Sequence, residues 1–294
     1  MFELIQVSDK CFYIDAPSKI GVIRIDGNNV CLIDSGNDKD AGKKVARILD
    51  ENSWKLMAIY NTHSHADHIG GNAYLQEKYK CDVFCYGIEC DFTNHTVLEP
   101  ALLYGGYPSA SLRHKFLMAK NSAAKPMCDE NLLSCIKKID LAGHSFDMVG
   151  FETDNVVFLA DALSSKETLD KYGIVYVFDV QKYLETLEKI KNFDGKLFIP
   201  SHANVTDDIK ALATYNIEKV YQVRDSILEI LSNPCTFEEI LKKIFDKYAL
   251  KMSHEQYALI GSTLHSYLSW LFDIGDIQSQ FSDNYQHWYR TCEI

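Results

Sequence analysis

Hydrophobic and polar positions alternate in short runs over the first 34 residues, and turn-forming pairs such as Gly27-Asn28 separate the runs. This pattern is typical of antiparallel strands joined by hairpins. From residue 41 the apolar positions take up helical spacing, which predicts a helix that ends near Glu51. A strand over 56–60 and a helix over 69–79 follow. Strands and helices therefore alternate, as in an α/β fold.

Residues 91–141 interrupt this alternation with a segment rich in Tyr, Gly and basic residues, which we expect to be an inserted cap with a helix over 110–120. Apolar runs then predict strands over 136–139, 148–151, 156–159 and 196–199, with an amphipathic helix over 180–190. Three helices, over 209–231, 236–245 and 253–272, precede a terminal hairpin. We expect a catalytic domain over 1–206 and a helical, winged-helix-like domain over 207–294.

Composition narrows the classes of function. The formal net charge is −11, which disfavours binding to nucleic acid or to anionic lipid. No stretch reaches the 18 or so apolar residues of a membrane span, and the N-terminus carries Glu3 and Asp9 where an export signal would be apolar or basic. The nine cysteines form no C-x-x-C pair. We therefore expect a soluble cytoplasmic protein with reduced thiols.

The segment NTHSHADHIGGN at 61–72 carries the chemistry, because it places three His and one Asp within six residues. His63 and His65 are two residues apart, so in extended backbone both imidazoles can face one ion. Asp67 and His68 follow where the chain turns into a helix and can face a second ion nearby. Imidazole and carboxylate ligands suit zinc, iron or manganese.

These residues are similar to the H-x-H-x-D-H signature of the metallo-β-lactamase superfamily, and the further motifs of that family occur in order. CLIDSG contains Asp34, LAGHS contains His144, VVFLADAL contains Asp161, and IPSH contains His202. The resemblance spans the whole first domain. It implies the αββα sandwich of the metallo-β-lactamase fold, with the C-terminal helical domain added to it.

Residue by residue, the resemblance implies two metal sites. His63, His65 and His144 would hold one ion, Asp67, His68 and His202 would hold the other, and Asp161 would bridge them. Asp34 would orient the ligand loop through hydrogen bonds. We expect two divalent ions, zinc first, with manganese or iron as alternatives.

An aspartate at position 161 resembles the glyoxalase II, lactonase and nuclease branches rather than the best-known β-lactamases, which have Cys or Ser there. Two ions about 3.5–4 Å apart would activate a shared, metal-bridging hydroxide and polarise the substrate. Asp67 or Asp161 could accept the proton. The expected reaction is hydrolysis of a small ester, thioester or lactone.

The cap and the tail bear on the substrate and on partners. Arg113 and Lys115 give the cap a basic character that favours an anionic substrate, and Tyr104 and Tyr107 are candidates for the pocket mouth. The tail 215–294 holds seven basic and eleven acidic side chains, a net charge of −4, which disfavours a nucleic-acid reader. We expect the tail to serve packing or homodimerisation.

Three alternatives stay open. A single-strand endoribonuclease would cleave a phosphodiester with the same ligands. An iron-dependent oxidoreductase could also use them, although the flavodiiron branch requires a Glu where His65 stands. A winged-helix regulator with a metal-sensing domain would need no turnover.

Overall fold

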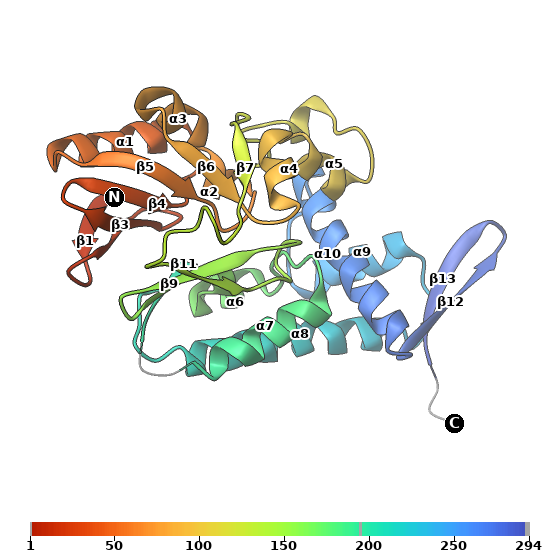
Figure 1. Cartoon of the computed structure of the whole chain (residues 1–294). Coiled ribbons are helices and arrows are strands. Elements are labelled where there is room, and N and C mark those ends of the chain that lie inside the picture. Colours follow the sequence, from red (N-terminus) through yellow and green to blue (C-terminus); the bar gives the residue numbers. More distant parts are fainter. Residues whose placement is uncertain (1, 194–195, 292–294) are drawn as a thin grey trace.

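The computed structural model describes residues 2–193 and 196–291, which form four layers in the order helices, sheet, sheet, helices (Figure 1). The larger sheet has the strand order β1-β2-β3-β4-β5-β6-β7. Its strands are β1 (Glu3–Gln6), β2 (Cys11–Asp15), β3 (Ile20–Asp26), β4 (Asn29–Ile33), β5 (Lys55–Tyr60), β6 (Asp82–Cys85) and β7 (Ala124–Pro126). Strands β1 to β4 pair antiparallel, and β4 to β7 pair parallel.

The smaller sheet has the order β11-β10-β9-β8. Its strands are β8 (Lys137–Asp140), β9 (Val149–Thr153), β10 (Val156–Ser164) and β11 (Leu197–His202). The pair β10 and β11 is parallel, and its register shifts between Phe158, Ala160 and Ser164. These shifts interrupt the regular strand where Asp161 lies.

Helices cover the outer face of each sheet and extend into the tail. They are α1 (Lys39–Glu51), α2 (Ala66–Ile69), α3 (Asn72–Tyr79), α4 (Glu89–Asn94), α5 (Leu98–Tyr104), the 3₁₀ turn η1 (Ala110–Leu112), α6 (Lys166–Tyr172), α7 (Val180–Lys191), α8 (Lys210–Ile230), α9 (Phe237–Lys247) and α10 (His254–Asp273). The hairpin β12 (Ile277–Ser282) and β13 (Tyr285–Arg290) follows α10 and projects from the molecule (Figure 1). Within the described residues, no helix combines the length and the apolar character needed to cross a membrane.

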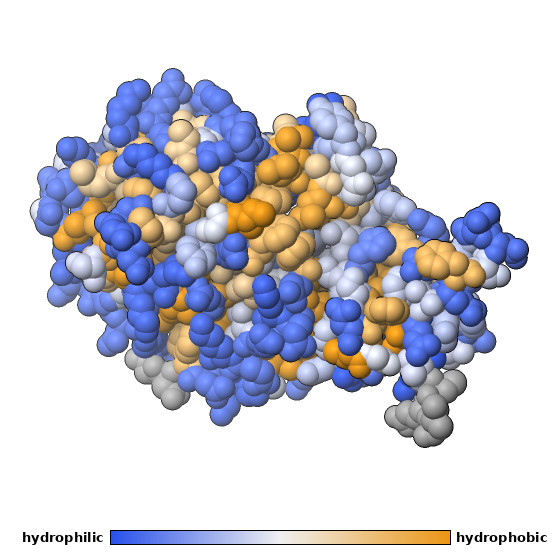
Figure 2. Space-filling view, turned by 45° about the vertical axis from the view of Figure 1, so that its right-hand side comes forward, coloured by the Kyte–Doolittle hydropathy of each residue, from blue (hydrophilic) through white to orange (hydrophobic). Residues whose placement is uncertain are grey.

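Three apolar cores fill the spaces between the four layers. Val45 and Leu49 of α1 pack with Ile14 of the larger sheet in the first core. Tyr60 and Phe151 face each other in the second core, between the sheets. The third core joins the smaller sheet to α7 and α8 and continues into α9 and α10. Polar side chains dominate the outer surface, and apolar ones gather in a band across the middle of the face in Figure 2.

The element order confirms most of the predicted strands and helices, including the capping box of Thr236 and Glu239 that opens α9. The predicted helix over 110–120 is wrong, because only the 3₁₀ turn η1 forms there. Leu112 and Leu117 both pack against the cluster that contains Leu103 of α5. Five residues apart, they would point about 140° away from each other on an α-helix. An irregular turn lets both point inward.

The helix predicted over 69–79 is also interrupted. It divides at Gly70-Gly71 into α2 and α3. The short helix α2 contains Asp67 and His68 of the ligand motif. The proposed division into domains at residue 206 stays a prediction. The third core is continuous from the smaller sheet into the tail helices, so the two parts share buried apolar surface.

Candidate metal centre

The ligand loop leaves the larger sheet at the end of β5 and enters α2, for which His65 is the N-cap residue. Two contacts tie it to the loop that follows β4. The Ser35 N–H donates to the His68 carbonyl at 2.8 Å, and the Gly71 N–H donates to Ser35 Oγ at 3.1 Å. The parallel pairing of β4 and β5 brings these two loops to the same edge of the sheet.

Three imidazoles form a first cluster, defined as His63, His65 and His144. His65 Nδ1 lies 3.1 Å from His63 Nε2 and 3.0 Å from His144 Nε2. His144 follows Gly143, whose φ is +125° and where a Cβ would lie 2.3 Å from the backbone nitrogen of Tyr183. Only glycine fits this close approach, so the LAGHS motif places His144 through its backbone as well as its side chain.

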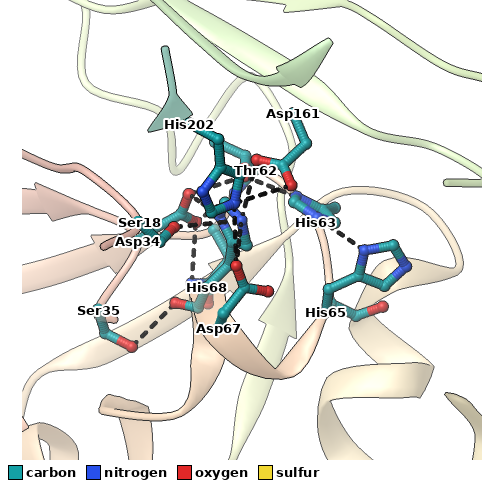
Figure 3. Close-up of polar contacts among 12 residues, drawn as sticks. Ser18, Asp34, Ser35, Thr62, His63, His65, Asp67, His68, Asp161 and His202 are labelled. Carbon is teal, nitrogen blue, oxygen red and sulfur yellow. Dashed lines mark hydrogen bonds and ion pairs between the residues drawn. The ribbon is translucent and has the colours of Figure 1, made fainter. Parts of the chain in front are cut away.

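Two carboxylates and two imidazoles form a second cluster, defined as Asp67, His68, Asp161 and His202. His202 Nε2 lies 3.1 Å from an Asp67 oxygen and 3.2 Å from an Asp161 oxygen. His68 Nε2 lies 3.1 Å from the other Asp161 oxygen. Figure 3 shows these side chains pointing toward one another. Asp67 and His68 belong to α2, Asp161 lies within β10, and His202 ends β11.

Asp161 lies between the two clusters. Its Oδ2 is 3.6 Å from His144 Nε2 of the first cluster and 3.2 Å from His202 Nε2 of the second. Its Oδ1 is buried and accepts no hydrogen bond from the described residues, although His68 Nε2 is close to it. A buried carboxylate oxygen without a donor is costly unless another positive group satisfies it.

Hydrogen bonds fix the tautomers of three histidines. The His202 Nδ1–H donates to the Pro17 carbonyl at 3.0 Å, because a carbonyl can only accept. The His68 Nδ1–H donates to Asp34 Oδ2 at 2.8 Å. Thr62 Oγ donates to the same carboxylate and therefore accepts from His63 Nδ1–H at 3.0 Å. With a metal bound in place of any Nε2 proton, each Nε2 would present its lone pair to the clusters, as metal-ligating histidines require.

The two clusters differ in charge. Burial, together with the neighbouring imidazoles, lowers the pKa of His65 and of His144 to about 4. In the second cluster Asp161 raises the pKa of His202 to about 10, against the effect of burial. Burial also opposes protonation of His68, but Asp161 and Asp67 outweigh it and raise its pKa well above the ordinary value. Without a metal, protons on these two histidines balance the carboxylates.

This donor set fits metal ions. Nitrogen ligands about 2.0–2.1 Å from a tetrahedral zinc lie about 3.3 Å from one another, close to the spacings within the first cluster. Three neutral imidazoles resemble the protein ligands of a zinc site with an open position. The second cluster supplies two anionic oxygens besides two imidazoles, and the unsatisfied Asp161 oxygen can complete its coordination.

Asp34 takes the place predicted for a supporting residue. It is buried at the end of β4, and its Oδ1 accepts from the Thr62 N–H at 2.8 Å while its Oδ2 accepts from Thr62 Oγ–H and His68 Nδ1–H. Its φ is +63°, a left-handed conformation that Asp tolerates better than most residues. The carboxylate thus orients one imidazole of the second cluster directly.

The four predicted substrate-binding residues do not lie together. Tyr104 lines a groove beside the first cluster. Arg113 Nη1 donates to the Tyr107 hydroxyl at 3.0 Å and its guanidinium lies over that ring, and neither residue lines the groove. Lys115 pairs with Asp38 at 2.9 Å and lines a different cavity.

Sequence reasoning missed two side chains at the centre. Tyr176 packs edge-on against the rings of His65 and His144, with centroid distances of 5.5 and 5.6 Å. Glu89 is buried and accepts hydrogen bonds from both loops that carry the first cluster. Neither lies in a recognisable motif, and no spacing rule connects residue 89 or 176 to the ligand loop.

A four-layer fold with seven His and Asp side chains at one edge of its sheets defines a class of metalloproteins. The chain belongs to the metallo-beta-lactamase superfamily, whose family model matches residues 14–202. This match confirms the fold class predicted from the motifs.

Individual relatives agree with this assignment. A hydroxyacylglutathione hydrolase from Crocosphaera subtropica is 44% identical over 54 residues, which are 18% of this chain and 21% of that protein, so the match spans about a fifth of the relative. One from Haemophilus ducreyi is 27% identical over 192 residues, 64% of this chain and 67% of that protein. The crystal structure of a metallo-beta-lactamase family protein from Thermus thermophilus has a TM-score of 0.71 at 15% identity, covering 99% of this chain and 98% of that one. At this identity the structural likeness concerns the fold alone.

Proposed function

We propose that this protein is a binuclear metal-dependent hydrolase of a small ester, thioester or lactone. The observation that carries the proposal is the pair of adjoining clusters with Asp161 between them. The relatives named hydroxyacylglutathione hydrolase support a hydrolytic activity on a thioester-like bond. Zinc is the proposed metal, with manganese or iron as alternatives that the same ligands accept.

Each side chain has a role in this proposal. His63, His65 and His144 would hold one ion, and Asp67, His68 and His202 the other, with Asp161 shared between them. Bound there, the ions would supply an activated water and an electrophile for the scissile carbonyl oxygen. The Asp67 carboxylate is partly accessible, so it can accept a proton from the attacking water.

A groove of about 800 Å³ beside the first cluster is the proposed substrate site. It runs between α5 and α10, where Gly261 and Ser262 of α10 form part of its wall. Leu102, Leu103 and Phe178 line both this groove and a smaller adjoining cavity that reaches His65. This cavity has a volume of only about 10 Å³, so these three side chains form the wall between the groove and the first cluster. The lining of the groove mixes apolar side chains with polar ones, mostly Ser and Asp, which suits a small organic substrate.

The preference for an anionic substrate stays a prediction without support from the groove. Among the described residues that line it, Asp179 and Asp273 carry charge and no Lys or Arg does. A neutral, partly apolar acyl compound is therefore the better match.

The tail elements follow the order of three helices and a hairpin, which supports our proposal of a winged-helix-like unit. That order is also the one observation that favours the endoribonuclease alternative, and the acidic balance of residues 215–294 speaks against it. The expected homodimer and the cytoplasmic location stay predictions.

Elemental analysis tests the proposal first. The unmodified protein, purified without added metal or chelator, should carry close to two zinc or manganese ions per chain, and the His65→Ala, Asp161→Ala double variant should lose them. An Asp9→Ala, His95→Ala variant removes the same residue types from the exposed surface and should keep both ions. A single iron would instead favour the oxidoreductase alternative, and a metal-free protein would refute the metal centre.

Turnover is the second measurement. The loaded protein is assayed on panels of small thioesters, lactones and single-stranded RNA, with both variants as controls. Hydrolysis of an acyl compound that disappears only in the His65→Ala, Asp161→Ala variant supports the proposal. Cleavage of RNA with no acyl hydrolysis would replace it by the endoribonuclease.

A further inference from the structure

Glu89, the first residue of α4, is only 1% exposed and accepts four hydrogen bonds. Its Oε2 accepts from the Ser64 backbone N–H at 2.9 Å and from the Ser64 hydroxyl at 2.5 Å. Its Oε1 accepts from the Ser145 hydroxyl at 2.7 Å and from the Asp147 backbone N–H at 3.1 Å. Each oxygen therefore has one backbone donor and one hydroxyl donor, which is the acceptor-only role of an ionised carboxylate.

The donors flank every histidine of the first cluster. Ser64 lies between His63 and His65, and Ser145 follows His144 directly. One buried carboxylate therefore bonds to two loops that are far apart in the chain and holds them beside each other. The distances between the ring nitrogens of His63, His65 and His144 therefore depend on the relative position of these two loops.

A second contact reinforces this junction. The Ile88 N–H donates to Asp147 Oδ2 at 3.0 Å, immediately before Glu89. Gly87 has a φ of +52°, and a Cβ there would lie 2.1 Å from the same carboxylate oxygen. The turn that begins α4 is therefore fitted closely to the loop that carries His144.

The second cluster has other supports. Asp34 receives the His68 Nδ1–H, and the Pro17 carbonyl receives the His202 Nδ1–H. Asp161 belongs to β10, within the smaller sheet. None of the hydrogen bonds described for Glu89 reaches a residue of this cluster.

We propose that Glu89 is a positioning residue that sets the geometry of the first cluster and thereby the affinity of one metal site out of two. The inference rests on the proposed binuclear centre. Glu89 would touch neither metal nor substrate, and it acts through the loops that present His63, His65 and His144.

The substitution Glu89→Gln tests this role with almost no change in shape. Whichever carboxylate oxygen the amide NH₂ replaces, it faces one backbone N–H, either that of Ser64 or that of Asp147. A hydroxyl can rotate to accept from the amide, but a backbone N–H cannot. One loop must move, so glutamine cannot reproduce the junction.

The experiment is a titration of the chelator-treated protein with Zn²⁺ under competition from a chromophoric chelator. The unmodified protein should bind two ions, and Glu89→Gln should bind one of them normally and the other about 10–100-fold more weakly, the range found for partners that orient metal ligands. Glu152→Gln, which removes a carboxylate paired with Lys196 on the smaller sheet, is the matched control and should bind both ions normally.

Two variants assign the weakened site. Adding Glu89→Gln to His144→Ala should not weaken Zn²⁺ binding further, because His144→Ala already disrupts the first cluster. Adding it to His202→Ala should retain the full effect. Ser145→Ala removes one donor and leaves the carboxylate in place, so it should weaken the same site less, and it remains informative if Glu89→Gln does not fold.

The outcomes of the titration test the role of Glu89 separately from the proposed binuclear centre. If the unmodified protein binds two ions and neither Glu89→Gln nor Ser145→Ala changes either affinity, the role of Glu89 is refuted and the binuclear centre stands. Equal weakening of both sites would also refute a positioning role for the first cluster. An unmodified protein that binds no Zn²⁺ would overturn both proposals.

Discussion

Replacing Asp34 by asparagine should weaken the second metal site, because the amide cannot accept all the hydrogen bonds that the carboxylate accepts. Asp34 Oδ1 faces the Thr62 N–H, and Oδ2 faces both Thr62 Oγ–H and His68 Nδ1–H. The Thr62 backbone N–H can only donate, so the asparagine oxygen must take the place of Oδ1. The NH₂ group then faces His68 Nδ1, where two donors would meet. Asparagine tolerates the left-handed φ of +63° as well as aspartate does, so the backbone has no reason to change.

The expected response is a switch of the His68 tautomer. A proton on Nε2 in place of Nδ1 would let Nδ1 accept from the amide, but Nε2 would then point its N–H at the second cluster. A buried hydrogen bond to a charged group contributes about 1.5–3 kcal/mol, and each 1.4 kcal/mol is about tenfold in an equilibrium constant. We therefore expect about 10–100-fold weaker binding at the second site.

Zinc titration of chelator-treated Asp34→Asn measures this loss, and nitrogen chemical shifts of the His68 ring in the zinc-loaded protein report which ring nitrogen carries the proton. Asp26→Asn, at the exposed end of β3, serves as the control for the same chemical change. Two ions bound at unmodified affinity, with His68 still protonated on Nδ1, would show that the Asp34 carboxylate does not determine the tautomer.

The other predictions concern the groove, the contact between the sheets, and pH. Gly261→Leu should lower kcat/KM while metal content stays at two, because a Cβ there would meet only Phe237 Cζ within 4 Å and a leucine would extend into the groove; unchanged kcat/KM would place the substrate elsewhere. Gly21→Ala should lower the free energy of unfolding in urea by about 1–3 kcal/mol, since its Cβ would lie 2.7 Å from the Phe158 ring of the opposite sheet. The metal-free protein should lose stability as pH falls from about 6.5 to about 4, because burial lowers the pKa of His65 and His144 to about 4 in the folded state and the unfolded chain takes up their protons first. Thermal unfolding across this range should show a smaller loss for His144→Gln, and an equal loss would assign the effect to other groups.

The side chains that the sequence motifs singled out lie together in the two clusters, and their role as metal ligands stays a prediction. His63 follows β5 and His202 ends β11, and strand ends of such sheets meet at one edge, so the strand pattern favours their convergence. Asp161 lies inside β10, where the register shifts. Helix α9 was predictable because its capping box and apolar spacing are local features.

Features that depend on distant packing were not predictable. The turn at Leu112 and Leu117 forms because both side chains fill the space beside α5 and α10, and helical propensity over 110–120 gives no sign of that contact. Lys115 looked like a substrate ligand from its charge, but it pairs with Asp38 at the start of α1. In the sequence Glu89 is only an acidic residue at the start of a helix. Its hydrogen bonds to Ser64 and Ser145 depend on the tertiary fold and could not be predicted.

The two supporting carboxylates are not equivalent, and the difference makes their variants distinguishable. Asp34 accepts a hydrogen bond from His68 directly. It also accepts one from Thr62 Oγ–H, so Thr62 Oγ must in turn accept from His63 Nδ1–H. A disturbance at Asp34 can therefore pass to both clusters. Glu89 bonds only to the loops of the first cluster, so its effect should stay there. Zinc binding to Asp34→Asn should then show a large loss at the second site with a smaller one at the first, whereas Glu89→Gln should affect the first site alone. A loss at the second site alone in Asp34→Asn would mean that the hydrogen bonds through Thr62 do not couple the clusters.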